Sequence, residues 1–269
     1  MAVITKITTQ KNNAERFNIF IDNGAGEEYG FSVDQDVLIS WGLKKGMEID
    51  VEAVEKILAE DKVKKAYNLA LSYLSYRMRS EKEVIDYLKR KEFADQEISL
   101  VLKKLNEYNF LNDNDFATAF VRTKKNTGVK GPKNIKQELS KKGIYGKIAL
   151  EALDEYTYAE QLEHILKWIE KQAKKTLRES EQAYQQRITR QLLAKGYSYE
   201  AIEEGIRTST VSFDNDQKWE AISFQAEKGK KKFAHLGDYE YRYKMKQWLY
   251  KKGFPLDLID QYLEENREQ

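Results

Sequence analysis

Six basic side chains lie on either side of a loop with two glycines, in "RTKKNTGVKGPKNIK" at residues 122–136. They are Arg122, Lys124, Lys125, Lys130, Lys133 and Lys136. A glycine-containing backbone flanked by cationic side chains can follow a phosphate backbone or an acidic protein surface. The loop lacks the spacing of a nucleotide-binding P-loop and the Ser or Thr that follows its lysine. It therefore predicts an anion-binding surface.

A second basic segment, "GDYEYRYKMKQWLYKKG" at residues 237–253, interleaves aromatic and cationic residues. Single-strand binders combine base stacking with basic grooves in this way. Four of its apolar residues, however, have the spacing of one helix face: Tyr241, Met245, Trp248 and Leu249. We favour a core position for these four. That arrangement leaves Arg242 and Lys246 free to bind.

No group of residues has the types and spacing of a catalytic or metal site. The only histidines are His164 and His235, and His164 lies in an amphipathic helical pattern that favours a surface or packing role. "NDNDF" at residues 112–116 lacks the later glycine and glutamate of a calcium loop, and we interpret Asp113 as a helix cap. Cysteine is absent, which excludes disulfides and thiolate metal sites. We expect no enzyme activity, no cofactor and no metal.

The composition describes a folded protein with a very polar surface. Charged residues make up 33% of the 269 residues and hydrophobic residues 41%. No apolar run reaches the roughly 18 residues of a membrane helix, and we expect a cytoplasmic protein without a membrane segment. The net charge of +2 hides basic segments: residues 119–149 hold nine basic residues and one acidic residue. Such segments indicate a partner with negative charge, although solvated lysine surface accounts for them equally well.

The first 51 residues predict a small β-rich domain. "RFNIFID" and "EYGFSV" alternate apolar and polar residues with the period of half-buried strands. Between them, Asn23 and Gly24 favour a tight turn. "VITKITT" and "MEIDV" are candidates for two more strands, and a short helix is expected to begin at Asp34.

One ending recurs four times in the rest of the chain: "LKRKEF" (88–93), "LSKKGI" (139–144), "LLAKGY" (192–197) and "LYKKGF" (249–254). Aligned on the last residue, the copies share apolar residues nine and five positions earlier and nine positions later. Lysine stands two positions earlier, and glycine one position earlier in all but the first copy, which has Glu92. The pattern predicts a helix that ends at a left-handed glycine, with the next apolar residue folding back on the last turn.

Each copy joins two helices and follows another helical segment, so the unit is three helices. The first segments are expected at about 62–78, 113–126, 158–177 and 215–232. Small units of this kind bury little alone and must stack on their neighbours. We therefore predict a mainly α protein with tandem three-helix repeats in an elongated curved array. The expected domains are a β-rich domain at 1–51 and repeats at 52–109, 110–156, 157–210 and 211–269.

Two long stretches resemble the RecX family, regulators of the RecA recombinase. They are residues 70–93, with "LSYRMRSEKEV", and residues 105–144, with "FLNDNDFA" and the glycine-terminated ending "LSKKGI". The resemblance is specific over residues 62–155 and looser in the two later repeats. Longer family members resemble this chain in carrying an N-terminal β extension and an extra repeat.

The resemblance implies a non-enzymatic modulator in DNA repair and homologous recombination. It implies binding in the groove of the filament that RecA forms on single-stranded DNA, with inhibition of ATP turnover, strand exchange and filament growth. Arg77 and Arg79 of the family motif join the basic residues above as expected contacts with RecA or DNA. The alternative is an independent protein that binds single- or double-stranded DNA and competes with RecA for it. We expect a monomer.

Overall fold

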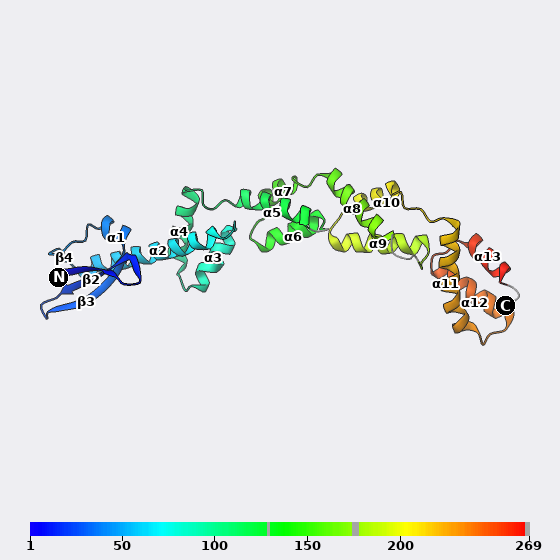
Figure 1. Ribbon diagram of the computed structural model, residues 1–269, viewed down its shortest axis with the longest axis horizontal. Coiled ribbons are helices and arrows are strands. Elements are labelled where there is room, and N and C mark those ends of the chain that lie inside the picture. The colour runs from blue at the N-terminus through cyan, green and yellow to red at the C-terminus, as the bar shows by residue number, and fades with distance from the viewer. Residues whose placement is uncertain (128–129, 174–177, 267–269) are drawn as a thin grey trace. The chain divides into compact units, whose positions relative to one another are not determined.

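The computed structural model describes residues 1–127, 130–173 and 178–266 (Figure 1). The strands are β1 (Ala2–Gln10), β2 (Asn13–Asp22), β3 (Glu27–Asp34) and β4 (Glu48–Ile49). The helices are α1 (Gln35–Ser40), α2 (Val51–Ser75), α3 (Glu81–Arg90), α4 (Asp95–Glu107), α5 (Asp113–Thr127), α6 (Pro132–Lys141), α7 (Gly146–Leu153), α8 (Tyr158–Ala173), α9 (Glu181–Lys195), α10 (Tyr199–Thr208), α11 (Asn215–Phe233), α12 (Asp238–Lys251) and α13 (Leu256–Glu265). The predicted β-rich domain followed by tandem three-helix units is confirmed.

The chain divides into two compact units, each described by itself. One contains Met1–Ala117 and Lys141–Ile148, and the other contains Thr118–Ser140 and Ala149–Gln269. The first unit begins with an antiparallel sheet in the order β3-β2-β1-β4. Ile4, Ile19 and Val33 are fully buried on one face of the sheet, as the alternating pattern requires. The β2–β3 turn uses left-handed Gly24 and Gly26, whose amides both bond to the Asp22 side chain.

Helix α2 joins the β-rich domain to the first three-helix unit without a linker. It begins at the Asp50 cap, eleven residues before the expected segment at 62–78. Ile57 belongs to the core of the sheet, whereas Ala66 and Ala70 belong to the core of the first repeat. Asp61, midway along the helix, is buried and bonds to Arg16 of β2 at 2.8 Å. A single helix therefore contributes to two cores.

The four aligned endings close their helices as predicted. All eight residues in the two apolar columns before the ending are fully buried: Val84, Leu88, Ile135, Leu139, Ile188, Leu192, Met245 and Leu249. The backbone φ is +87° at Gly143, +91° at Gly196 and +83° at Gly253. The amide after the left-handed residue folds back, as in Tyr197 N to Leu192 O at 3.2 Å.

At three of these endings, the start of the middle helix of the preceding three-helix unit packs against the end of the helix. At the end of α9, the amides of Gly131 and Lys133 bond to the carbonyls of Lys195 and Gly196 at 2.8 and 3.1 Å. At the end of α12, the Ser180 hydroxyl donates to the Lys252 carbonyl at 2.6 Å. Helix starts have free donors and helix ends have free acceptors, so the junction at the end of α9 satisfies both, whereas at the end of α12 a side-chain hydroxyl satisfies the acceptor.

The first unit holds the same junction between α3 and residues 141–143. Lys82 Nζ donates to the Lys141 carbonyl at 3.3 Å, and Lys142 pairs with Glu83 at 2.5 Å. Glu83 also accepts from Arg77 and from the Ser80 amide, which completes a capping box. Burial raises the pKa of the Glu83 carboxyl, but the hydrogen bonds from Arg77, Lys142 and Ser80 outweigh it and lower the pKa to about 2.

Each junction requires the absence of a side chain. A Cβ would lie 2.7 Å from Lys82 Cβ at Gly143, 2.6 Å from Asn134 N at Gly196 and 2.8 Å from Ser180 Oγ at Gly253. The first ending receives no preceding three-helix unit, and there Glu92 adopts a φ of +64° in place of glycine. Left-handed backbone is accessible to glutamate at a cost, whereas a close approach to another helix start leaves no room for its Cβ.

One predicted helix start differs in detail. The Asn112 side chain, not Asp113, accepts the free amides at the start of α5, from Asn114 at 2.9 Å and Asp115 at 3.3 Å. Asp113 instead accepts from the Glu81 amide at the start of α3, at 2.9 Å. Pro132 is the first residue of α6, and Pro255 stands at the N-cap, one residue before α13.

We predict opposite effects from substitutions at Gly196 and Glu92. Gly196→Ala should lower the free energy of unfolding by about 2 kcal/mol or more, because it adds left-handed strain and a clash with Asn134. Glu92→Gly should raise the free energy of unfolding by up to about 1 kcal/mol, because it relieves left-handed strain at an ending against which no other helix start packs. Urea unfolding followed by circular dichroism measures both. Equal destabilisation by the two changes would contradict the role given to the junction.

A second prediction concerns Glu83 and acid. Its folded pKa is depressed, so its contribution is present above the unfolded value of about 4.3 and is lost as pH falls toward 2. Glu83→Gln should lower stability at pH 7 by about 2 kcal/mol and flatten the loss between pH 4.3 and 2. Glu107→Gln is the control, because Glu107 lies 3.9 Å from Lys103 on an exposed surface. Parallel stability curves for wild type and Glu83→Gln would refute this prediction.

Candidate functional site

The two predicted arginines that follow α2 are held by neighbours in the first unit. Arg77 donates to Glu83 at 2.9 Å. The Arg79 guanidinium lies 4.1 Å from the centre of the Tyr73 ring, and this ring stacks on Tyr87 at 4.1 Å. Arg77 is thus paired with a carboxylate, whereas Arg79 lies on a ring and forms no ion pair with any residue that the structure describes.

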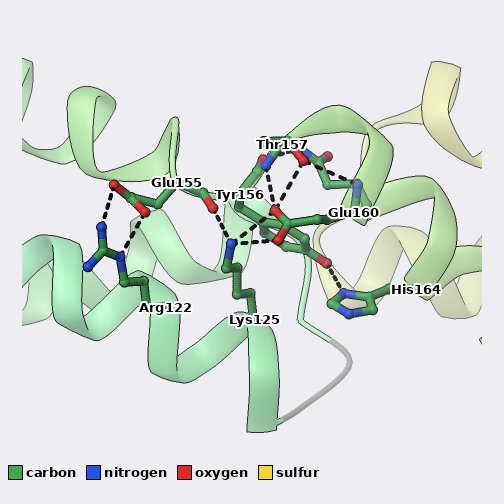
Figure 2. A network of polar contacts seen from close by, with 8 residues as sticks. Arg122, Lys125, Glu155, Tyr156, Thr157, Glu160 and His164 are labelled. Carbon is green, nitrogen blue, oxygen red and sulfur yellow. Dashed lines mark hydrogen bonds and ion pairs between the residues drawn. The ribbon is translucent and has the colours of Figure 1, made fainter.

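Two predicted cations of α5 form ion pairs with the segment between α7 and α8 (Figure 2). Arg122 makes a two-pronged contact with Glu155, at 2.8 and 3.0 Å. Lys125 contacts Glu160 at 2.7 Å and also donates to the Glu155 carbonyl, and its side chain is 13% exposed. The hydrogen bond from Arg122 lowers the pKa of Glu155, and that from Lys125 lowers the pKa of Glu160. Both cations are therefore engaged in internal ion pairs that hold α5 against the start of α8.

Lys124 and Lys130 share one carboxylate, Glu138 of α6. Lys124 lies 3.3 Å from Glu138, and Lys130 is in direct contact with it. Burial raises the pKa of Glu138, but the hydrogen bonds from Lys130 and Lys124 outweigh it and lower the pKa. Glu138, the only acidic residue of the basic segment 119–149, therefore pairs with two of its lysines. Gly128, the first glycine of the predicted binding loop, lies outside the described residues.

His164 is a packing residue, as its helical pattern predicts. Its Nδ1 lies 2.6 Å from the Tyr156 hydroxyl, which also lies 2.9 Å from the Tyr197 hydroxyl (Figure 2). Burial, followed by the hydrogen bond with Tyr197, raises the pKa of Tyr156. The three side chains close the core where α8 meets α10.

The remaining predicted cations have more freedom. Lys133 and Lys136 are exposed and form no ion pair with any described residue, and the same holds for half-buried Arg242. Lys246 pairs with Asp260 at 2.5 Å. As favoured from the helix-face spacing, Met245 and Leu249 are fully buried, and Tyr241 and Trp248 pack against the same core.

Another set of cations lies on aromatic rings, an arrangement that the sequence did not predict. Its members are Arg178, Lys195, Lys228, Lys232 and Lys252. Two of its signals are local: the four-residue steps from Phe224 to Lys228 and on to Lys232 in α11, and the four-residue step from Trp248 to Lys252. The contacts of Arg178 with Phe224 and of Lys232 with Trp248 join segments that are distant in sequence.

Neither a metal cluster nor a membrane-spanning helix is present in the part of the chain that the structure describes. There, no group of three or more His, Asp or Glu side chains could hold a metal ion. No described helix is both long enough and apolar enough to cross a bilayer.

Comparison with protein families matches nearly the whole chain. Models described as the regulatory protein RecX N-terminal domain and the first, second and third RecX three-helix domains match residues 2–50, 66–105, 112–153, and both 159–206 and 215–263. The third three-helix model thus matches twice, once over α8–α10 and once over α11–α13.

Similar proteins and structures carry the same name. A "Regulatory protein RecX" of Halalkalibacterium halodurans is 46% identical and covers 98% of this chain and 99% of its own. That of Bacillus subtilis (strain 168) is 45% identical with the same coverage. A crystal structure of regulatory protein RecX shares 34% identity at a TM-score of 0.68, over 77% of this chain and all of that one. One of RecX from Lactobacillus salivarius shares 42% identity at a TM-score of 0.54, over 55% of this chain and 96% of that one.

The matched segments include the sheet, the junction helices and the glycine endings described above. Identity above 40% extends over almost the full length of this chain and of the curated relatives. The chain belongs to the RecX family of regulatory proteins.

Proposed function

We propose that this chain regulates the RecA recombinase by binding in the helical groove of the RecA–single-stranded DNA filament. There it limits ATP hydrolysis, strand exchange and filament growth, without turning over a substrate of its own. It acts as a monomer in the cytoplasm, in recombinational repair and the SOS response.

The recurring junction is the observation that carries this proposal. The same helix-end contact is made at Gly143, Gly196 and Gly253, so equivalent residues return every 53 to 57 positions along the sequence. A filament of identical protomers also presents one surface at regular intervals. Contacts that are weak one by one gain strength when linked, because each later contact forms at high effective concentration.

Unpaired cations favour an anionic nucleoprotein as the partner. Lys133, Lys136 and Arg242 are available, and their attraction to DNA phosphates or acidic protein surfaces falls with salt. The alternative function is independent DNA binding, in which the chain affects RecA by occupying the strand. The same cations favour this alternative. The order in which the chain, RecA and DNA are mixed must therefore distinguish the two functions.

We predict that affinity for RecA assembled on single-stranded DNA exceeds affinity for RecA or DNA alone by tenfold or more, which corresponds to about 1.4 kcal/mol. The measurement is fluorescence anisotropy of the labelled chain against each partner, with RecA held on DNA by a slowly hydrolysed ATP analogue. Equal affinity for the filament and for naked DNA would contradict groove binding. Relief of ATPase inhibition by added naked single-stranded DNA would favour competition.

We also predict that charge reversal at Lys133, Lys136 and Arg242 weakens filament binding by about tenfold and lessens its salt dependence. These three positions are suitable because no internal ion pair is broken, unlike at Lys124, Lys125 or Lys130. Reversal of exposed Lys44, Lys45 and Lys62 is the control with the same change in net charge. An equal loss in both variants would show that only net charge matters.

A further inference from the structure

Four exposed cations lie on two aromatic rings in the second unit. Arg178 and Lys228 lie 4.7 and 4.3 Å from the centre of the Phe224 ring. Lys232 and Lys252 lie 5.0 and 4.7 Å from the Trp248 ring. We call Arg178, Lys228, Lys232 and Lys252 the ring-held cations. Their rings belong to α11 and α12, which lie side by side within this unit (Figure 1).

The Trp248 ring is fixed by contacts with the backbone of α11. Trp248 donates its indole N–H to the Gln225 carbonyl at 3.3 Å and crosses α11 at Gly229, where a Cβ would lie 3.3 Å from the indole. Gln225 also donates its side-chain amide to the Arg178 carbonyl at 2.6 Å. The segment before α9 is therefore tied to α11, and through Ser180 to the Lys252 carbonyl. These hydrogen bonds link the segments that carry Arg178, Lys228 and Lys252.

No carboxylate among the described residues neutralises these four cations. The neighbouring acids are paired elsewhere: Glu179 with Arg187 at 2.6 Å and Glu227 with Lys230 at 3.3 Å. Cation–π contact positions a charge without cancelling it. This distinguishes the ring-held cations from Arg122, Lys124, Lys125 and Lys130, each of which is paired with glutamate.

We propose that the ring-held cations bind the phosphodiester backbone of nucleic acid. The ammonium group of an unpaired lysine is a compact point charge, and it can donate to a phosphate oxygen from many directions. Lys228 and Lys232 are one helical turn apart, about 6 Å, a step comparable with that between successive phosphates of one strand. The cations cover the faces of Phe224 and Trp248, so the surface reads the backbone and does not stack bases. The identity of the nucleic acid rests on the proposed function, in which it is the single strand of DNA that RecA coats.

The test uses the full-length chain with Arg178, Lys228, Lys232 and Lys252 all replaced by Gln. Binding to a fluorescein-labelled oligothymidylate and to a duplex of equal length is measured by anisotropy across a salt series. We expect affinity to fall at least tenfold, and the slope of log affinity against log salt for the single strand to shrink by about 3, from four lost phosphate contacts. The single-stranded and duplex arms identify which form of nucleic acid the surface takes.

Two further variants keep the test decisive. Replacement of Lys44, Lys45, Lys62 and Lys65 by Gln removes the same charge from exposed positions of the first unit. Replacement of the three ring-held lysines by Arg keeps the charge and the ring contacts, so it should keep the affinity even if the Gln variant is less stable. A loss as large in the control as in the Gln variant would overturn the proposal, as would failure of the Arg variant.

A third arm repeats the series on RecA-coated oligothymidylate. If the Gln variant loses affinity for the filament but keeps it for naked DNA, the cations contact protein and the proposal is wrong. If wild type does not bind the filament, the proposed function fails, while the result on naked DNA still decides the ring-held cations. The two failures are therefore distinguishable.

Discussion

The close approach of one helix start to another helix end is the constraint on which the repeated architecture depends. A three-helix unit of this size buries too little surface to be stable alone, so it must be joined to its neighbours. At Gly143, Gly196 and Gly253 the backbone must turn into the left-handed region and leave room for the start of the preceding unit's middle helix. One residue type satisfies both demands, and the rest of each ending is adapted to it: lysine beside it, and buried apolar residues on the helix before it.

Charge is distributed differently in space from the way it is distributed along the chain. Residues 119–149 are strongly basic in sequence, yet Glu138 inside the segment and Glu155 and Glu160 beyond it pair with four of its cations. These pairs contribute to holding helices together and leave less charge for a partner. The ring-held cations show the opposite case. Trp248 and the segment before α9 place cations beside those of α11, and no carboxylate among the described residues pairs with them.

The sequence predicted those parts of the fold that local periodicity determines. The two apolar columns, the left-handed endings and the alternation in β2 and β3 all depend on residues close to one another in the chain, and the structure confirms them. The continuity of α2 was missed because its two halves pack into different cores. The partners of Lys125 and Arg178 could not be predicted, since each depends on where a distant segment lies. Asp113 illustrates the same limit: its local pattern indicates a cap for its own helix, whereas its hydrogen bond goes to another.

Glu92 gives the series of units a defined first member. Its helix end has the same turn as the other three, but it carries the Cβ that would collide with an incoming helix start at 2.6–2.8 Å elsewhere. Gene duplication can therefore lengthen such a protein behind the first unit with parts that already fit, whereas an added unit in front of it would first require a change at this position. The first unit is thus fitted to follow the β-rich domain, to which α2 joins it, and not another three-helix unit.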